Sequence, residues 1–185
     1  YKVIKRSEMP KNRRCVKSKW VFKIKRNLIF RARLVACGYS QIPGVDFTEN
    51  YSPVVNDIAF RLLILAMVLF GKSGKIADVE TAFLYGELDE EIYMECPLGM
   101  KNVTEEDVLL LLQCIYGLVQ AARQYHKKVC KILREIGFQG GDVDPCLFVK
   151  KSDKGICWIT VYVDDNLLVG DPLAIDDAIK QMREK

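Results

Sequence analysis

Histidine is nearly absent from this chain of 185 residues, which contains only His126. The sequence therefore offers no material for metal sites built on several histidines, and little for a serine triad. We expect His126 to lie on a helix surface or to pack beside Tyr125.

Paired cysteine motifs are also missing. The seven cysteines are odd in number, scattered and never spaced as CxxC, at Cys15, Cys37, Cys96, Cys114, Cys130, Cys146 and Cys157. This pattern excludes a disulfide framework and a zinc ribbon, and it predicts a reducing, intracellular environment.

Long hydrophobic runs are lacking as well. The longest, residues 62–70, is far shorter than the roughly 20 residues that span a bilayer, and no leader of charged and then apolar residues begins the chain. We therefore expect neither membrane insertion nor secretion. The chain begins at Tyr1 and ends within a helical pattern, so we expect a piece of a longer protein.

Acidic residues are scarce in the first part of the chain. The whole sequence has 28 basic and 24 acidic residues, a net charge of +4, but the many basic residues between Lys2 and Arg33 are opposed only by Glu8. This polarised charge is compatible with a nucleic-acid partner.

Alternation and turn signals predict an α+β fold in which helices cover an antiparallel sheet. Alternating apolar and basic residues predict a half-exposed strand over residues 15–25, and a second run over 28–36 completes a hairpin with one basic face. Residues 58–70 are almost entirely apolar between Asp57, a helix cap, and Gly71, so we expect a buried helix. The other predicted elements are strands at 75–79, 91–95, 108–114, 146–150, 156–163 and 167–169, and helices at 120–136 and after Asp171-Pro172.

Two adjacent carboxylates occur at the predicted tip of a hairpin, in Tyr162-Val163-Asp164-Asp165-Asn166. Aspartates are common in turns because they hydrogen-bond their own backbone, which is one explanation of this dipeptide. Two carboxylates at the head of a buried hairpin also suit magnesium, which prefers oxygen ligands. Both interpretations are open at this point.

A third carboxylate, Asp78, follows the apolar residues Ile76 and Ala77 in a short predicted strand. By itself it would be a solvated aspartate at a strand end. Three such carboxylates on two neighbouring strands would hold two metal ions about 4 Å apart, an arrangement that activates a hydroxyl and stabilises a departing oxygen. Phosphoryl transfer is therefore the chemistry that the pattern favours.

Seven short motifs carry a resemblance to a known family. They are Trp20-Val-Phe-Lys-Ile-Lys, Arg31-Ala-Arg-Leu-Val-Ala-Cys-Gly-Tyr-Ser-Gln, Tyr51-Ser-Pro-Val, Asp78-Val-Glu-Thr-Ala-Phe-Leu-Tyr-Gly, Tyr93-Met-Glu-Cys-Pro, Tyr116-Gly-Leu-Val-Gln-Ala-Ala-Arg and Tyr162-Val-Asp-Asp. In this order and spacing, from about Lys17 to Gly170, the chain resembles the reverse transcriptase of copia-type LTR retrotransposons (Pseudoviridae-like).

The resemblance implies roles for individual residues. Asp78 corresponds to the first metal-binding aspartate of the palm, and Asp164 and Asp165 to the pair in the catalytic tetrapeptide. The implied nucleotide-binding residues are Phe83 beneath the incoming sugar, Gln120, Arg31 and Arg33. The implied nucleic-acid contacts are Lys23, Lys25, Tyr162 and Val163. Judged without the family, Phe83 is equally a core residue, Gln120 an exposed residue at a helix start, and the basic strand a solvated face.

The resemblance also implies a fold and partners. It implies the fingers and palm of a right-hand polymerase, with fingers over residues 1–57 and an incomplete palm over 58–185 that lacks the thumb and ribonuclease H. The expected activity is RNA-directed DNA polymerisation with two Mg²⁺ ions, or Mn²⁺, a primed RNA or DNA template and deoxynucleotide triphosphates. The parent polyprotein would supply integrase and ribonuclease H, in a cytoplasmic virus-like particle or the nucleus.

Two other functions compete with this one. The first is a non-catalytic remnant that retains only nucleic-acid binding. The second is an unrelated RNA-binding domain. The intact Asp78, Asp164 and Asp165 favour the polymerase, whereas the truncation favours the remnant. Departures from the family suggest relaxed selection or a divergent lineage: a short turn after Arg26, Cys37 for arginine, no proline in Ala121-Ala122-Arg123, Tyr125 for tryptophan, and Asn166 after the aspartates. Asn166 would place a polar group in a strand that we expect to be buried.

Overall fold

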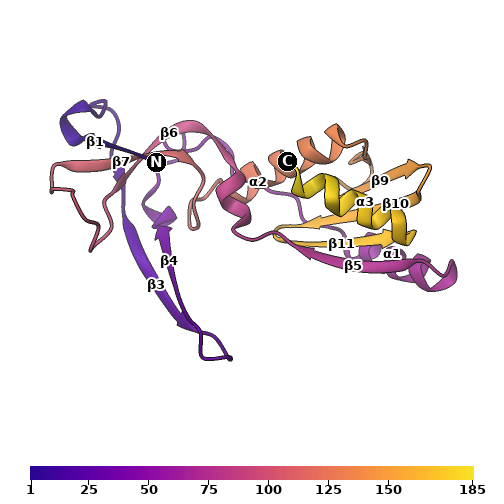
Figure 1. Cartoon of the computed structure of the whole chain (residues 1–185). Coiled ribbons are helices and arrows are strands. Elements are labelled where there is room, and N and C mark those ends of the chain that lie inside the picture. The colour runs from indigo at the N-terminus through magenta and orange to yellow at the C-terminus, as the bar shows by residue number, and fades with distance from the viewer. The chain divides into compact units, whose positions relative to one another are not determined.

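The computed structural model describes residues 1–185 and has a mixed α/β architecture of three sheets and three α-helices (Figure 1). The helices are α1 (Asp57–Leu69), α2 (Ala121–Glu135) and α3 (Pro172–Arg183), with 3-10 turns η1 (Arg6–Glu8), η2 (Gly38–Ser40) and η3 (Ala82–Tyr85). The strands are β1 (Lys2–Lys5), β2 (Cys15–Val16), β3 (Ser18–Ile24), β4 (Phe30–Ala36), β5 (Ser73–Asp78), β6 (Glu87–Glu95), β7 (Asp107–Gln113), β8 (Gln139–Gly140), β9 (Leu147–Ser152), β10 (Gly155–Tyr162) and β11 (Asp165–Gly170). No helix in the chain has the length and hydrophobicity that crossing a membrane requires.

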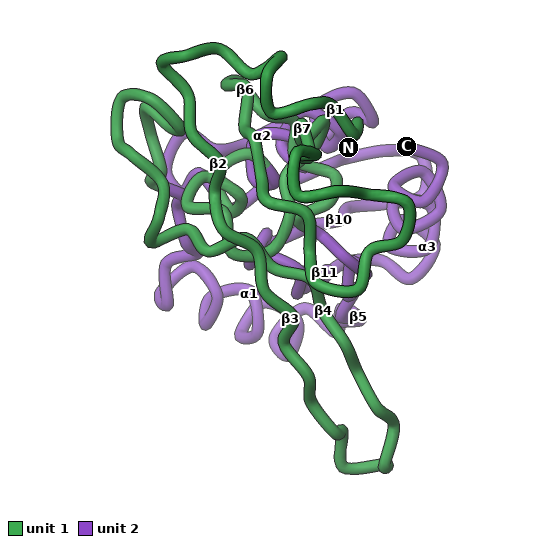
Figure 2. The backbone as a smooth tube through the Cα atoms, turned by 90° about the vertical axis from the view of Figure 1, so that its left-hand side faces the viewer, with its two compact units in different colours: residues 1–51, 83–124 green, residues 52–82, 125–185 purple.

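The chain divides into two compact units, each built from two separate segments (Figure 2). Unit 1 comprises residues 1–51 and 83–124, and unit 2 comprises residues 52–82 and 125–185. The predicted boundary between fingers (residues 1–57) and palm (residues 58–185) is a different division of the chain, and it stays a prediction.

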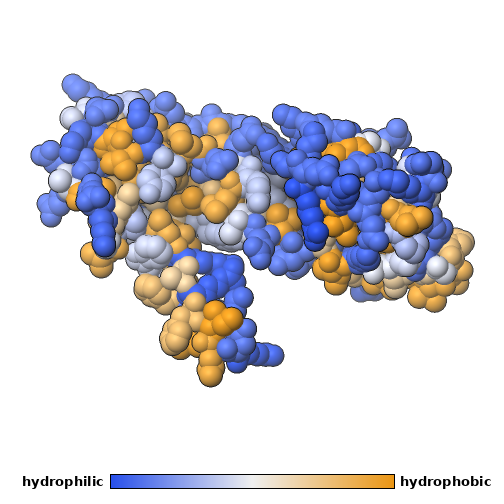
Figure 3. Space-filling model, viewed as in Figure 1, coloured by the Kyte–Doolittle hydropathy of each residue, from blue (hydrophilic) through white to orange (hydrophobic).

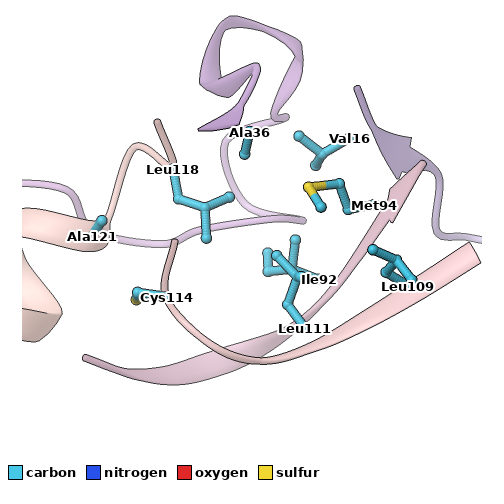
Figure 4. Packing of buried hydrophobic residues seen from close by; sticks show 9 residues of the cluster. All are labelled: Val16, Ala36, Ile92, Met94, Leu109, Leu111, Cys114, Leu118 and Ala121. Carbon is cyan, nitrogen blue, oxygen red and sulfur yellow. The ribbon is translucent and has the colours of Figure 1, made fainter. Parts of the chain in front are cut away.

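Unit 1 contains a sheet in the order β1-β7-β6-β2, antiparallel except for the pairing of β2 with β6. Ile92 pairs in register with Leu111 and Met94 with Leu109, which places four apolar side chains on one face of the sheet. These side chains form a buried cluster that also includes Val16, Ala36, Cys114, Leu118 and Ala121 (Figure 4). The cluster is the hydrophobic core that anchors the rest of unit 1.

A long two-stranded hairpin, β3–β4, extends from unit 1 (Figures 1 and 2). The hairpin was predicted, and its register is regular from Ser18 opposite Ala36 to Ile24 opposite Phe30. The expectation of a half-exposed strand was wrong, because apolar residues of the second face are also in solvent: Phe22 is 75% exposed and Phe30 82%. Figure 3 shows hydrophobic and hydrophilic residues together on this hairpin. The hairpin pairs with no other strand, and its base packs on the unit 1 core through Leu34 and Ala36.

Unit 2 contains an antiparallel sheet in the order β5-β11-β10-β9-β8. Helix α3 packs on β5, β10 and β11, and Ile175 of α3 and Ile159 and Leu168 of the sheet have no exposed surface. This part of the fold matches the predicted layer of a helix on an antiparallel sheet.

Helix α3 begins at Asp171-Pro172 as predicted, but the Asp171 side chain does not cap the helix. Its carboxylate instead accepts hydrogen bonds from the Ile156 amide at 2.8 Å and from Lys72 Nζ at 2.6 Å. The Lys72 ammonium is the main reason that the pKa of Asp171 lies below its usual value. The aspartate therefore ties the start of α3 to β10 and to the segment before β5.

Helix α1 forms where it was predicted, but the expectation that it is buried was wrong. Asn56, and not Asp57, is the cap, since its side chain accepts a hydrogen bond from the Ile58 amide at 2.8 Å. Only Leu63 is buried in the helix, whereas Val68 and most other apolar residues face solvent. The helix contacts β11, and it lies close to β5 at Gly74, where a Cβ would be 2.6 Å from Met67 Sδ. Figure 3 shows the resulting hydrophobic surface in the region of α1 and β5.

Candidate functional site

The three predicted catalytic carboxylates come together at one end of the unit 2 sheet. Asp78 is the last residue of β5 and Asp165 the first of β11, and the two are Cα partners in the antiparallel register. Directly opposite residues in such a pair have their side chains on the same face of the sheet. Asp78 and Asp165 are both exposed on that face.

Asp164 lies in the turn between β10 and β11, next to this pair. Its carbonyl accepts a hydrogen bond from the Val79 amide at 2.9 Å, so the turn is bonded directly to the residue after Asp78. Val163 has a φ of 51°, in the left-handed region that a β-branched residue rarely adopts. The turn thus places Asp164 next to Asp165, the first residue of β11.

The donor set suits a hard divalent cation, because all three groups are carboxylates on adjacent backbone segments. The side-chain positions do not themselves form a coordination site, since no three Asp, Glu, His or Cys side chains of the chain are grouped so that they could hold a metal ion. The backbone therefore fits the predicted ligand set, and coordination would require the exposed side chains to turn toward one another.

Asn166 follows the aspartates and is fully buried, as the sequence predicted for this strand. Its Nδ2 donates to the carbonyls of Ala77 at 3.3 Å and Asp164 at 3.4 Å, while its Oδ1 has no hydrogen-bond partner. A buried acceptor without a hydrogen bond lowers the free energy of unfolding, so the Oδ1 of Asn166 destabilises β11. The two hydrogen bonds from its Nδ2 act in the opposite direction, because they join the turn at Asp164 to β5.

A cavity of about 440 Å³ begins at Asp165 within unit 2. It is lined by Val55, Asp57, Phe60, Ile76, Thr160, Tyr162, Asp165, Asn166 and Leu167. Tyr162 pairs with Asp165, and Ile76 and Thr160 both pair with Leu167, so the lining shares the sheet face of the carboxylates. Its size is within the range of small-ligand sites.

The predicted basic residues lie on the β3–β4 hairpin of unit 1. Lys23 is directly opposite Arg31, and Val21 is opposite Arg33, so three cations share one face of the hairpin. None of the three has a carboxylate within ion-pair distance. Lys25 follows the end of β3, where its amide donates to the Ile29 carbonyl at 2.9 Å. Like charges opposite one another destabilise a hairpin, so this face suits an anionic ligand.

Arg33 and Phe83, both predicted to bind the nucleotide, are brought together by Tyr116. The Arg33 guanidinium lies over the Tyr116 ring, 4.7 Å from its centroid. Phe83 meets the same ring edge-on, at a centroid distance of 5.0 Å and an angle of 70°. Phe83 is half-buried against the unit 1 core cluster. Tyr116 is the first residue of one of the seven family motifs, and no other feature of the sequence indicated a role for it.

Gln120 is fully buried, which rules out the alternative of an exposed residue at a helix start. Its Nε2 donates to the Asp46 carbonyl at 2.9 Å, and its Oε1 accepts from Gln41 Nε2 at 3.0 Å. The Gln41 Oε1 accepts from the Val119 amide at 2.8 Å. A nucleotide contact by Gln120 stays a prediction, and it would require this amide to leave its protein partners.

We expect Gln41→Leu to lower the free energy of unfolding by about 2–6 kcal/mol, because it leaves the Val119 amide and Gln120 Oε1 buried without partners at about 1–3 kcal/mol each. Chemical denaturation of the purified chain measures this loss. Gln113→Leu, a matched change at an exposed glutamine of unit 1, should cost little. Equal losses in the two variants would mean that the buried network does not stabilise unit 1.

His126 lies half-buried on α2 between two thiols, a contact that the sequence did not reveal. Its Nε2 is 3.5 Å from Cys130 Sγ and 3.7 Å from Cys146 Sγ. Burial raises the pKa of Cys130 to about 11 and that of Cys146 to about 12, so both thiols are neutral at pH 7. All seven cysteines are free.

Comparison with known proteins places these features in a family. The chain matches the family described as "Reverse transcriptase (RNA-dependent DNA polymerase)" over residues 1–185. No solved structure matches the chain.

Several curated relatives are parts of mobile elements. The chain is 37% identical over 177 residues to the retrovirus-related Pol polyprotein from transposon TNT 1-94 of Nicotiana tabacum, covering 92% of this chain and 13% of that polyprotein. It is 34% identical over 174 residues to the Pol polyprotein from transposon RE1 of Arabidopsis thaliana, covering 90% and 12%. It is 36% identical over 105 residues to a putative transposon Ty5-1 protein of Saccharomyces cerevisiae, covering 56% and 34%.

The chain thus spans about one eighth of the plant polyproteins that it matches. The family match nevertheless covers all of its residues, including the three carboxylates and the basic hairpin. This chain belongs to the reverse transcriptase family, in the group found in copia-type retrotransposon Pol polyproteins.

Proposed function

We propose that this chain supplies the fingers and palm of an RNA-directed DNA polymerase, which extends a primer by nucleotidyl transfer from deoxynucleotide triphosphates. The observation that carries the proposal is the in-register pairing of Asp78 with Asp165, beside a turn that holds Asp164. Mg²⁺-dependent primer extension on RNA and DNA templates, by a polymerase that contains this domain within its Pol polyprotein, tests it.

In this proposal Asp78, Asp164 and Asp165 hold two Mg²⁺ ions, with Mn²⁺ as an alternative. Bound there, the ions would activate the primer hydroxyl and stabilise the departing pyrophosphate. The chain's own contribution is to bring three anionic residues to one end of the sheet, Asp78 and Asp165 on paired strands and Asp164 in the adjacent turn. The bond between the Val79 amide and the Asp164 carbonyl keeps that turn in place. Tyr162 lies on the same face as Asp165 and, with Val163, would contact the nucleic acid.

The basic hairpin supplies the complementary charge. Arg31 and Arg33 would bind the triphosphate, and Lys23 and Lys25 the template phosphates. The support is the repulsion between Lys23 and Arg31 across the hairpin, which an anionic ligand would relieve. Arginine also presents planar donors that match phosphate oxygens.

We expect replacement of Arg31 and Arg33 by alanine to raise the KM for deoxynucleotides by at least about tenfold, since each charged hydrogen bond is worth about 1.5–3 kcal/mol. Steady-state primer extension at varied nucleotide concentration measures this change. Replacing Arg61 and Arg183, exposed arginines of unit 2, removes the same charge as a control. An unchanged KM would assign Arg31 and Arg33 a structural role.

A second candidate function is nucleic-acid binding without catalysis, in a remnant of such an element. The basic hairpin face without acidic partners and the incomplete bonding of Asn166 favour it. The parent reading frame distinguishes the two: an integrase before this domain and ribonuclease H after it would indicate an intact polyprotein, expected in a virus-like particle or the nucleus. Stop codons in that frame would indicate a remnant.

A further inference from the structure

We propose that Tyr116 is a positioning residue of the nucleotide site, whose ring holds Arg33 and Phe83 as one surface. The inference rests on the proposed polymerase function and extends it to a residue with no assigned role. It makes Tyr116 a determinant of nucleotide affinity and of sugar selection.

The ring of Tyr116 contacts its two neighbours in different ways. The Arg33 guanidinium lies over the ring, with its Cζ 4.7 Å from the centroid, and this contact with the ring leaves the guanidinium without a carboxylate partner. Its N–H donors can therefore bind phosphate oxygens. Phe83 meets the ring edge-on at 5.0 Å and 70°, a favoured aromatic geometry that fixes the tilt of the phenylalanine. One side chain therefore orients both the predicted phosphate donor and the predicted sugar contact.

The backbone of Tyr116 is itself fixed. Two residues before it Cys114 is fully buried, and two residues after it Leu118 is buried, and both belong to the core cluster of unit 1 (Figure 4). The Ala36 amide, at the end of the strand that carries Arg33, donates to the Tyr116 carbonyl at 2.8 Å. The ring is thus attached to a rigid part of the unit.

The next residue shows how closely these segments approach. A Cβ at Gly117 would lie 2.1 Å from the Ala36 carbonyl oxygen, and its φ of 90° is one that glycine tolerates best. Gly117 lets the Tyr116 segment lie directly against the end of β4. Arg33 and Tyr116 are therefore held at a short spacing by backbone contacts, and not by their side chains alone.

The contrast with Gln120 supports this assignment. The Gln120 amide is fully buried and bonded to Gln41 and Asp46, whereas the Tyr116 ring is only half-buried and has no hydrogen bond from its hydroxyl within the protein. Tyr116 and Gln120 belong to the same motif, but only Tyr116 can contribute to a ligand site without breaking hydrogen bonds within the protein.

Replacing Tyr116 by leucine, in the polymerase with its full Pol polyprotein, tests the proposal. We expect the deoxynucleotide KM to rise about 5–20-fold and the ribo-to-deoxy ratio of kcat/KM to rise several-fold, because Arg33 and Phe83 lose their common support. The KM for primed template should not change. Tyr116→Phe retains the ring and should behave nearly as the parent, and so should Tyr39→Leu, a change at an exposed tyrosine of unit 1.

The double variant with Phe83→Val shows whether Tyr116 acts through Phe83. If it does, the ribo-to-deoxy ratio of the double variant should equal that of Phe83→Val alone. A Tyr116→Leu variant with a lowered Tm but an unchanged KM and ratio would overturn the proposal. If that variant does not fold, Tyr116→Met is measured against the same outcomes. A parent protein that does not extend primers would instead contradict the polymerase function itself.

Discussion

Asp164→Asn should abolish primer extension, lowering kcat by about 10²–10⁴-fold, while template binding stays nearly unchanged. A metal ion contributes several kcal/mol of transition-state stabilisation, at about 1.36 kcal/mol for each tenfold change in rate. Asparagine keeps the size of the side chain but removes the anionic ligand. Template affinity depends instead on basic residues that contact phosphates, and the substitution does not touch them.

A second measurement on Asp164→Asn does not depend on activity. Millimolar Mg²⁺ or Mn²⁺ should raise the Tm of the parent protein, because an ion that binds only the folded state stabilises it, and this shift should shrink in the variant. Asp153→Asn, at an exposed turn of the same sheet, is the matched control. Extension within a few-fold of the parent would return Asp164-Asp165 to the ordinary role of aspartates in a turn.

Phe83→Val should admit ribonucleotides, raising their kcat/KM relative to deoxynucleotides by about 10–100-fold, or roughly 1.4–2.7 kcal/mol. If Phe83 lies beneath the incoming sugar, its ring leaves no room for a 2′-hydroxyl, and a packed site cannot yield to relieve the clash. Competition assays with paired ribo- and deoxynucleotides measure the ratio directly.

The alternative, that Phe83 is a core residue, is also supported by the structure, because its ring packs against the unit 1 cluster. Truncation of a buried phenylalanine costs about 3–5 kcal/mol for alanine and somewhat less for valine, and it would depress both activities equally. Leu88→Val, at a half-buried neighbour of the same cluster, should lower the Tm without changing the ratio. An unchanged ratio in Phe83→Val, with a lowered Tm, would make Phe83 a core residue.

Local signals in the sequence predicted most of the secondary structure. The alternation in residues 15–36 sufficed for the β3–β4 hairpin, and the turn after Ser152 for β9–β10, because strand pairing across a short turn is a local event. Strand β1 was not predicted, and β2 was predicted only as the beginning of one strand over residues 15–25, because both are short and pair with β7 and β6 far along the chain. Non-local pairing has no local sequence signal.

Burial was predicted less well than secondary structure. The apolar composition of α1 indicated a buried helix, but burial depends on which surfaces meet, and in α1 only Leu63 is buried. The same limit applies to Gln120. Its position at a helix start left exposure open as an alternative, whereas Gln41 and Asp46 bond the side chain in the interior. Composition describes a segment, whereas burial is a property of the contact between segments.

The parts of the candidate site that are close together in the sequence were predicted, and those that depend on long-range contacts were not. Asp164 and Asp165 are adjacent in the sequence, and their relation to Asp78 followed from the expectation of two neighbouring strands, which the register bears out. The role of Tyr116 could not be predicted from the residues alone, because it depends on contacts with residues far away in the sequence. Arg33 of β4 and Phe83 of η3 meet at its ring only in the folded chain.

The left-handed backbone at Val163 sets the stability of this turn against its predicted contact with nucleic acid. A β-branched residue at a φ of 51° has a conformational cost that glycine or asparagine would avoid. Val163→Asn should therefore raise the Tm, and the same change would remove the valine side chain from the turn next to Asp164.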